Sequence, residues 1–329
     1  MKTPETQELQ SFSVSQMGGL LLAYLRRNTR EAADHQGHRS FHYYPTGVEG
    51  ILEFEILPIW NGNAGTEPLN RLRHLFNDAI TLLNREDLIR PDLSQSSSRE
   101  FFQLTSRGES VQIRSNWELR LMKSTTDVIE MVRPSVLHLV AYDQNDDPAN
   151  GTCFIIDGNH LLTCKHNLDL QRWEIHFPTG QQISGDRFVV HPHPTRDLAI
   201  LSLREPEDAV LFKGLSPLLL GHSTLISPGD TLIAFGYPDI PSRYPIQLHV
   251  DGIYQGTTRY YNNDPYVTMS NPVQGGYSGG PVLSLYGEVV AVTTQSTGRG
   301  DDTNGAGIER SVHNHGTPIE EIFTMLQSV

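Results

Sequence analysis

The sequence predicts a mainly β protein, with a small α+β domain at residues 1–125 preceding an all-β domain at 126–329. Two observations carry this prediction. The first part contains one long helical pattern and few strands. The second part contains many short apolar runs separated by Gly, Pro and Asn. A succession of short strands with such punctuation is typical of a β-sandwich or a β-barrel.

In the first part, apolar residues at helical spacing predict an amphipathic helix over 68–85. Packing inside its own domain is the simpler role for this helix, and binding a partner is the alternative. Residues 16–27 predict a short helix, 50–57 alternate like a strand, and 92–98 are polar like a loop. No chemical motif occurs in this part, so regulation or target recognition is its expected role.

In the second part, the predicted strands are short and regular. They cover 135–141, 151–157, 160–164, 173–178, 187–190, 198–203, 230–235, 246–254, 266–269, 280–285 and 288–295, and a short helix covers 319–326. Gly158 and Asn159 predict a two-residue hairpin turn between the second and third of these strands. That register would place Cys153 opposite Cys164.

Composition narrows the classes of partner and compartment. The net charge is −13, and most of it falls after residue 130. This charge disfavours nucleic acid and anionic membranes and favours neutral or basic substrates. The polar start lacks a secretory signal, the apolar run at 17–25 is too short to cross a bilayer, and there are two cysteines. A cytoplasmic protein is the expectation, and a secreted form written without its signal peptide is the alternative.

The stretch at 273–281 (VQGGYSGGP) holds four glycines and one serine, Ser278. Glycine permits backbone angles that other residues avoid, so this run can expose the serine and turn nearby N–H groups toward one point. A carbonyl under attack needs such donors where negative charge develops. A simple glycine-rich hairpin is the alternative interpretation.

Two other residues complete a catalytic pattern. His166 follows a predicted strand directly, and Asp197 directly precedes another. Each has a structural explanation on its own, as a strand-end histidine or a capping aspartate. Together with Ser278 they occur in the order His, Asp, Ser, which is one of the recurring orders of a catalytic triad.

With these residues in place, the sequence resembles the trypsin/chymotrypsin-like serine protease family, and most closely its HtrA/Deg-type branch. The resemblance covers about 130–312 and follows several collinear stretches. These are 151–157 (GTCFIID), 161–166 (LLTCKH), 197–201 (DLAIL), 219–223 (LLGHS), 228–230 (PGD), 235–238 (FGYP), 277–282 (YSGGPV) and 287–292 (GEVVAV).

The resemblance implies two six-stranded antiparallel barrels in a chymotrypsin-like arrangement, with the active site between them. His166 would act as general base and acid, Asp197 would orient it, and Ser278 would be the nucleophile. The backbone N–H groups of Gly276 and Ser278 would form the oxyanion hole.

The same resemblance implies a substrate-binding region near Val273 and along Thr293, Thr294 and Ser296. The last strand there would pair with the substrate backbone. The absence of a carboxylate before the nucleophile loop favours a small or medium apolar residue over Lys or Arg.

The chain departs from the family pattern in three ways. A PDZ-like domain is not expected, since few residues follow 312. Tyr277 stands where many secreted relatives have an acidic residue that captures a newly cut N-terminus, so activation of that kind is not expected. Residues 1–125 have no counterpart in the resemblance.

Metal ligation is an alternative use of the histidines at 191–194 (HPHP) and 313–315 (HNH), but neither stretch has a third ligand at the usual spacing. No metal and no cofactor are therefore expected. In a reducing compartment the two cysteines would be free thiols, and a redox switch beside His166 is the alternative.

Taken together, the sequence predicts a serine endopeptidase that cleaves proteins or peptides through an acyl-enzyme. Its first domain would regulate or target it, and an activating protein partner is a further hypothesis. The rival from another class is a catalytically silent trypsin-like fold that serves as a protein-binding scaffold.

Overall fold

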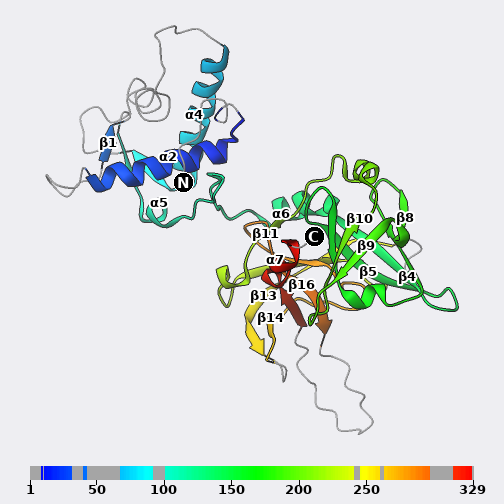
Figure 1. Ribbon diagram of the computed structural model, residues 1–329. Helices are drawn as coiled ribbons and strands as arrows, with labels where there is room; N and C mark the ends of the chain where they lie inside the picture. Colours follow the sequence, from blue (N-terminus) through cyan, green and yellow to red (C-terminus); the bar gives the residue numbers. More distant parts are fainter. Residues whose placement is uncertain are drawn as a thin grey trace. The chain divides into compact units, whose positions relative to one another are not determined.

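The computed structural model describes residues 9, 11–31, 40–42, 67–91, 101–240, 245–259, 263–296 and 314–327. The chain divides into two compact units, residues 1–121 and 122–329. Figure 1 shows both units and labels many of the elements named below. None of the helices in the described ranges is long and apolar enough to cross a membrane.

The first unit is built around two helices, α2 (Val14–Glu31) and α4 (Glu67–Arg85). The apolar face of each helix packs against the other, as the spacing over 68–85 predicts. A small antiparallel sheet has the order β1 (Ser40–His42), β3 (Phe101–Leu104), β2 (Ile89–Pro91), and α5 (Ser106–Ser110) follows it. The strand predicted at 50–57 and the loop at 92–98 lie outside the described residues.

The second unit begins with α6 (Thr125–Val132) and a short 3₁₀ turn, η3 (Arg133–Ser135). A first sheet of seven strands then has the order β8-β7-β4-β5-β6-β10-β9. Its strands are β4 (Val136–Tyr142), β5 (Pro148–Ile155), β6 (His160–Thr163), β7 (Arg172–His176), β8 (Gln182–Ser184), β9 (Phe188–Pro192) and β10 (Ala199–Leu203). Three further 3₁₀ turns lie along this part of the chain: η4 (Lys165–Leu168), η5 (Gly185–Arg187) and η6 (Pro206–Phe212).

The second sheet of this unit closes on itself. Six of its strands form a ring in the order β12-β13-β14-β17-β16-β15, and β11 pairs in parallel with the first two residues of β16. Its strands are β11 (Leu219–Leu220), β12 (Thr231–Gly236), β13 (Leu248–Arg259), β14 (Pro265–Met269), β15 (Pro281–Ser284), β16 (Glu288–Ser296) and β17 (Asn314–Pro318). A 3₁₀ turn, η7 (Ser223–Leu225), lies between β11 and β12.

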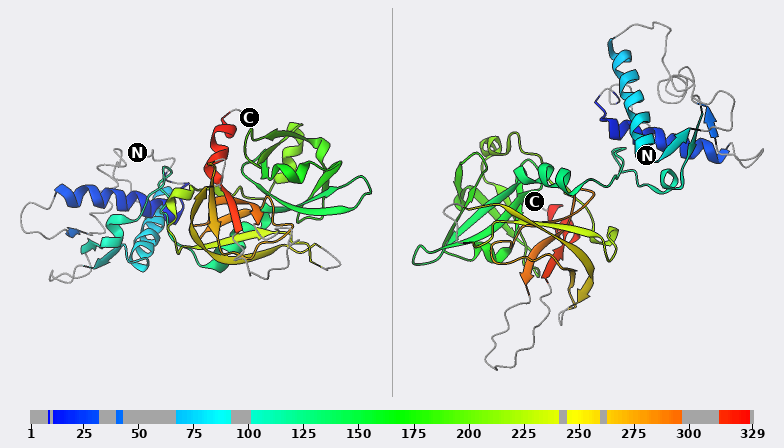
Figure 2. Two further views of the ribbon diagram at one scale, coloured as in Figure 1. Left: turned by 90° about the horizontal axis from the view of Figure 1, so that it is seen from below. Right: turned by 180° about the vertical axis from the view of Figure 1, so that it is seen from behind.

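The predicted fold class is confirmed: the protein is mainly β, and its second unit is a pair of antiparallel sheets (Figure 2). The second sheet is a closed six-stranded barrel, whereas the first curves without a ladder that joins β8 to β9 among the described strands. Each sheet has its own apolar core. A third core joins residues from both sheets, and α6, η8 (Ile319–Ile322) and α7 (Phe323–Leu326) pack into it.

The predicted register of the β5–β6 hairpin is wrong by one residue. Cys153 pairs with Thr163, and the tight turn is longer than Gly158 and Asn159 alone. The physical reason is the side chain of Asp157, whose Oδ1 accepts the N–H of Asn159 at 2.8 Å and also contacts Nδ1 of His160 at 2.7 Å. Such an aspartate-centred turn adds a residue to the loop.

The corrected register separates the two cysteines. A shift of one residue moves a side chain to the other face of a strand. Cys153 accordingly packs in the core of the first sheet, and Cys164 packs in the core between the sheets. Both thiols are free and buried, so the geometry does not support the cross-strand pair predicted from a two-residue turn.

Candidate active site

His166 lies where β6 gives way to the single 3₁₀ turn η4. The extended backbone of Cys164 ends the strand, and the turn that follows presents the imidazole at the surface, with 45% of its side chain exposed. The next residue, Asn167, is buried. The short turn therefore directs two adjacent polar side chains in different directions, one outward and one into the protein.

Asp197 lies in the turn between β9 and β10. This turn is closed by the N–H of His193, which donates to the carbonyl of Leu198 at 2.8 Å. Nδ1 of the same histidine accepts the N–H groups of Thr195 at 3.2 Å and Arg196 at 2.8 Å. The turn thus places the carboxylate of Asp197 directly before a buried strand.

The structure brings His166 and Asp197 together through two hydrogen bonds. Oδ2 of Asp197 lies 2.6 Å from Nδ1 of His166, and Oδ1 accepts the backbone N–H of His166 at 3.0 Å. One carboxylate oxygen thus orients the ring while the other fixes the backbone that carries it. With Nδ1 occupied by the aspartate, Nε2 is the nitrogen left to exchange a proton with a substrate or a nucleophile.

The electrostatics of the pair follow from this contact. The hydrogen bond to Asp197 raises the pKa of His166 above its usual value, against the opposing effect of burial. Burial works to raise the pKa of Asp197, but the hydrogen bonds from His166 prevail and lower it. The aspartate therefore stays ionised at neutral pH and stabilises an imidazolium next to it.

Ser278 lies in the loop 270–280, which connects β14 to β15. Gly276 and Gly279 have φ angles of +90° and +84°, in a region that residues with a side chain rarely adopt. Between them, Tyr277 is 2% exposed and packs into the core of the second barrel. Two left-handed glycines on either side of a buried tyrosine leave Ser278 half-buried near the surface.

The loop is attached to the first sheet by hydrogen bonds to its backbone. The carbonyl of Ser278 accepts the N–H of Thr152 at 2.9 Å and Nδ2 of Asn167 at 2.8 Å. Oγ1 of Thr152 donates to the carbonyl of Gly276 at 2.7 Å. Ser278 is therefore bound through its main chain to β5 and to the residue next to His166. Within the described residues no hydrogen bond joins Oγ of Ser278 to Nε2 of His166.

Two N–H groups of this loop, those of Gly276 and Ser278, point away from the acceptors inside the loop. The carbonyl of Gly275 accepts the N–H of Asp239 at 3.1 Å, and the carbonyl of Tyr277 accepts the N–H of Gly280 at 2.8 Å. The described backbone contains no cis peptide. In a trans peptide the N–H points away from the preceding carbonyl, so the N–H groups of Gly276 and Ser278 point away from these acceptors. Neither N–H has an acceptor within the described part of the chain.

The predicted substrate-binding residues lie around the same loop. Val273 is buried at its start, and Thr293 uses both backbone groups to bind the loop, through its N–H to Gly280 and its carbonyl to Gly279, each at 2.8 Å. Thr294 is buried, and its Oγ1 accepts the hydroxyl of Thr317 at 3.2 Å. Ser296 pairs with Asn314 on β17, and only its backbone is described. Pairing of a substrate with this strand stays a prediction.

Sequence reasoning missed Asn167 and Thr152, the two side chains that connect the serine loop to the first sheet. Asn167 also donates to Oγ1 of Thr163 at 3.1 Å, and that hydroxyl donates to the carbonyl of Thr152 at 2.7 Å. Their only signal is position: Asn167 directly follows the predicted base, and Thr152 lies in β5, the strand that precedes the one ending at the base. Both are common polar residues, and burial alone reveals their role.

Cys164 adds a third group to the His166–Asp197 pair, because a potential ligand atom of each lies within 4.8 Å of the others. Zinc binds the thiolate form of cysteine. Here the thiol is fully buried, and its Sγ lies 3.2 Å from the carbonyl of Thr293. Burial and the nearby Asp197 raise the pKa of Cys164 well above its usual value. These properties suit a structural thiol that connects the two sheets better than a metal ligand.

The other histidines considered as ligands have structural contacts. His193 organises the turn that carries Asp197, as described above. His315 lies edge-on to the ring of Tyr266, with centroids 6.2 Å apart, and contacts Thr268. His313 lies outside the described residues.

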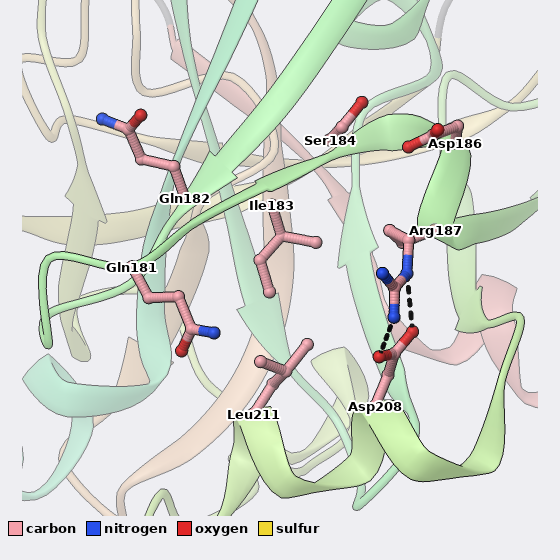
Figure 3. A pocket seen from close by; sticks show the side chains of 8 residues that line it. All are labelled: Gln181, Gln182, Ile183, Ser184, Asp186, Arg187, Asp208 and Leu211. Atoms are coloured by element: carbon pink, nitrogen blue, oxygen red, sulfur yellow. Dashed lines mark hydrogen bonds and ion pairs between the residues drawn. The ribbon is translucent and has the colours of Figure 1, made fainter.

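A hollow of about 350 Å³ lies elsewhere on the second unit, beside β8 and η6. Figure 3 shows its lining, where the side chains of Arg187 and Asp208 face each other and form an ion pair. This arginine already has its counter-ion, and the rest of the lining combines two glutamine amides, a serine hydroxyl, the carboxylate of Asp186 and two apolar side chains. None of the triad candidates lines it.

The comparisons with known proteins agree with this geometry. Residues 151–292 match the family of trypsin-like peptidase domains. The chain is 28% identical over 190 residues to serine protease HTRA1 of Xenopus laevis, covering 51% of this chain and 37% of that protein. It is 25% identical over 190 residues to the mitochondrial serine protease HTRA2 of Bos taurus, covering 53% and 39%. It therefore spans little more than a third of the length of these relatives.

Among solved structures, the HtrA-type protease AlgW with a tripeptide matches with a TM-score of 0.48 and 20% identity, over 62% of this chain and 63% of that one. The family match and the relatives agree: residues 151–292 are similar to trypsin-like peptidase domains, and the chain is similar to HtrA-type serine proteases.

Proposed function

We propose that the protein is a serine endopeptidase that hydrolyses peptide bonds through His166, Asp197 and Ser278. The observation that carries this proposal is the His166–Asp197 pair beside a serine loop in which the N–H groups of Gly276 and Ser278 have no acceptor among the described residues. A nucleophile, an oriented base and an oxyanion hole are the parts that acyl transfer requires. We further propose that residues 1–125 regulate or target the peptidase domain at 126–329.

The proposed reaction begins with attack of Ser278 Oγ on the substrate carbonyl. Nε2 of His166 takes the hydroxyl proton, and Asp197 stabilises the imidazolium that results. The carbonyl oxygen becomes negative and is bound by the N–H groups of Gly276 and Ser278. His166 then gives its proton to the leaving amine, which leaves an acyl-enzyme. Water then attacks the acyl-enzyme: His166 takes its proton and returns it to Oγ of Ser278, which leaves as the free hydroxyl.

The substrates proposed are proteins or peptides, and an activating protein partner acting through the first unit is compatible with a regulated enzyme. A cytoplasmic location also remains a proposal. The rival function is a catalytically silent scaffold that binds proteins. The specific observation in its favour is that Oγ of Ser278 has no hydrogen bond to His166 within the described residues, although in enzymes without substrate such bonds are often long.

Labelling with a fluorophosphonate probe separates the two functions. The intact protein is expected to form a covalent adduct on Ser278, and the Ser278→Ala variant is expected to form none. Ser227→Ala serves as the matched control, because Ser227 is exposed and lies outside the proposed site. Absence of labelling in the intact protein and also in a chain lacking residues 1–125 would favour the scaffold.

A further inference from the structure

A side-chain contact joins the first sheet to the loop of the proposed oxyanion hole. Asn150, on β5, donates from Nδ2 to Oδ1 of Asp239 at 2.6 Å. Asp239 follows β12, and its own N–H donates to the carbonyl of Gly275 at 3.1 Å. The contact therefore runs from the first sheet, through one carboxylate residue, to the peptide that precedes Gly276.

The segment 237–239, which carries Asp239, also packs closely against Gly276. A Cβ at Gly276 would lie 2.1 Å from the carbonyl oxygen of Tyr237 and 2.8 Å from Cα of Pro238. A Cβ at Gly275 would lie 2.9 Å from Oδ2 of Asp239. Residues 237–239 thus form one wall against which both glycines rest, and the position of this wall determines the direction of the Gly275–Gly276 peptide.

The other end of the contact is fixed as well. Oδ1 of Asn150 lies 2.7 Å from Nε2 of His138, and the imidazole of His138 stacks on the ring of Tyr237 with centroids 4.7 Å apart. Burial lowers the pKa of His138 to about 4, so the ring is neutral near pH 7 and carries a single N–H. With that proton on Nε2, the carbonyl of Asn150 accepts and its amide is left to donate to Asp239.

We propose that Asn150 and Asp239 are positioning residues that hold the Gly275–Gly276 peptide in the orientation required by the oxyanion hole. The inference rests on the proposed function and adds a residue pair to its machinery. Two adjacent glycines give this peptide unusual rotational freedom. If it turned over, the carbonyl of Gly275 would replace the N–H of Gly276 and would repel the developing oxyanion. The bond from Asp239 to that carbonyl opposes this rotation.

The decisive experiment exchanges the partners. Asn150→Asp places two carboxylates in contact, and we expect kcat on a chromogenic peptide substrate to fall by about ten- to a hundredfold, less than the full loss of an oxyanion donor. Asp239→Asn keeps an acceptor for Asn150 but replaces a charged acceptor by a neutral one, so a fall in kcat of about three- to tenfold is expected, smaller than in Asn150→Asp. The double exchange restores one donor and one acceptor, and it is expected to recover kcat to within about threefold of the wild type.

Two readouts separate positioning from general destabilisation. The acidic limb of the pH–rate profile reports His166 and is expected to stay unchanged in Asn150→Asp, because the pair with Asp197 is not touched. Asp251→Asn, an exposed charge change on β13, is expected to keep wild-type kcat. If Asn150→Asp does not fold, Asn150→Ala removes the donor without adding a charge, and a loss of about tenfold is expected.

The outcomes also distinguish this inference from the proposed function. An active wild type whose kcat survives both Asn150→Asp and Asn150→Ala would overturn the inference and leave the peptidase intact. Recovery in the double exchange would support it, and a double variant as impaired as Asn150→Asp would overturn it. A folded wild type with no turnover and no fluorophosphonate labelling would instead remove the proposed function, and the inference with it.

Discussion

Replacing Gly276 by alanine tests the oxyanion hole through a single methyl group. The residue has a φ of +90°, and its Cβ would lie 2.1 Å from the carbonyl oxygen of Tyr237. That oxygen belongs to the backbone, so it cannot move aside as the end of a flexible side chain could. The alanine must therefore shift the Gly276 peptide, and the N–H that we assign to the hole shifts with it.

The size of the effect follows from two terms. Left-handed backbone angles cost a residue with a side chain about 1–2 kcal/mol, and this term affects stability at any such position. The clash with Tyr237 adds a displacement of the catalytic N–H, and loss of one oxyanion donor typically lowers kcat about 10²–10³-fold. We expect a fall of that size in kcat for Gly276→Ala, with a smaller change in KM because the donor acts mainly in the transition state.

The matched control is Gly180→Ala. Gly180 has a φ of +84°, but a Cβ there would meet nothing within 4 Å. The two variants share the backbone strain and differ in the clash and in the proximity to the site. Thermal unfolding and steady-state kinetics on one peptide substrate are the measurements. Both variants are expected to lose stability, and only Gly276→Ala is expected to lose activity.

One result would refute this reasoning: a folded Gly276→Ala protein whose kcat equals that of Gly180→Ala. In that case the N–H of residue 276 does not stabilise the transition state, and the assignment of the hole to this loop would fail. A loss of activity that appears equally in Gly180→Ala would show that strain, rather than the position of the donor, is the cause.

Two further predictions concern the turn that carries Asp197. The hydrogen bond from Asp197 raises the pKa of His166 above its usual value of 6.5, so the acidic limb of the kcat/KM profile is expected above pH 6.5, with activity rising as His166 loses its proton. Asp197→Asn is expected to move that limb to lower pH and to reduce kcat about 10⁴-fold. An unmoved limb would contradict the pairing. The side chain of Arg196 is 1% exposed, pairs with Asp264 at 2.9 Å and lies over the ring of Tyr266. Arg196→Met is therefore expected to lower the free energy of unfolding by about 3 kcal/mol, against about 1 kcal/mol for Arg172→Met, where the arginine is exposed. Equal losses in chemical denaturation would show that the buried cation stabilises little.

Much of this fold is predictable because its strands are marked by local composition. β4, β10, β12 and β16 each contain a run of apolar residues, and each lies within two residues of its predicted bounds. The helix over 68–85 is predictable for the same reason, since its apolar spacing has a single period. In these segments local preference and tertiary packing favour the same structure.

In the second unit, the strands that the sequence did not predict lack such a signal. β8 has three residues, β11 has two, and β17 reads NHGTP, a sequence that favours a turn. β17 forms because it closes the barrel between β14 and β16, and its Gly316 leaves no room for a side chain, since a Cβ would lie 2.9 Å from Cβ of Ala291. Only the neighbouring strands reveal this requirement, so composition could not show it.

The candidate site divides in the same way. Residue type and order were sufficient to propose His166, Asp197 and Ser278, because the functional groups of a base, an acid and a nucleophile are visible in the sequence. Thr152 and Asn167 act through hydrogen bonds to backbone carbonyls of a loop more than 100 residues later in the chain. Thr152 and Gly276 are 124 residues apart in sequence, and Asn167 and Ser278 are 111 residues apart. Contacts of that range leave no periodic pattern in a single sequence.

These long-range contacts suggest why the serine loop depends on both sheets. Gly279 has no room for a side chain, because a Cβ would lie 2.2 Å from the carbonyl oxygen of Thr152 and 2.4 Å from Oγ1 of Thr163. The second barrel supplies the left-handed turn, but the first sheet supplies the atoms that the turn rests against. Ordering a glycine-rich loop costs much conformational entropy. The contacts that fix this loop exist only where the two sheets meet. Docking of the sheets and ordering of the nucleophile loop are therefore expected to occur as one event, so a perturbation at their interface should reduce catalysis before it unfolds either sheet.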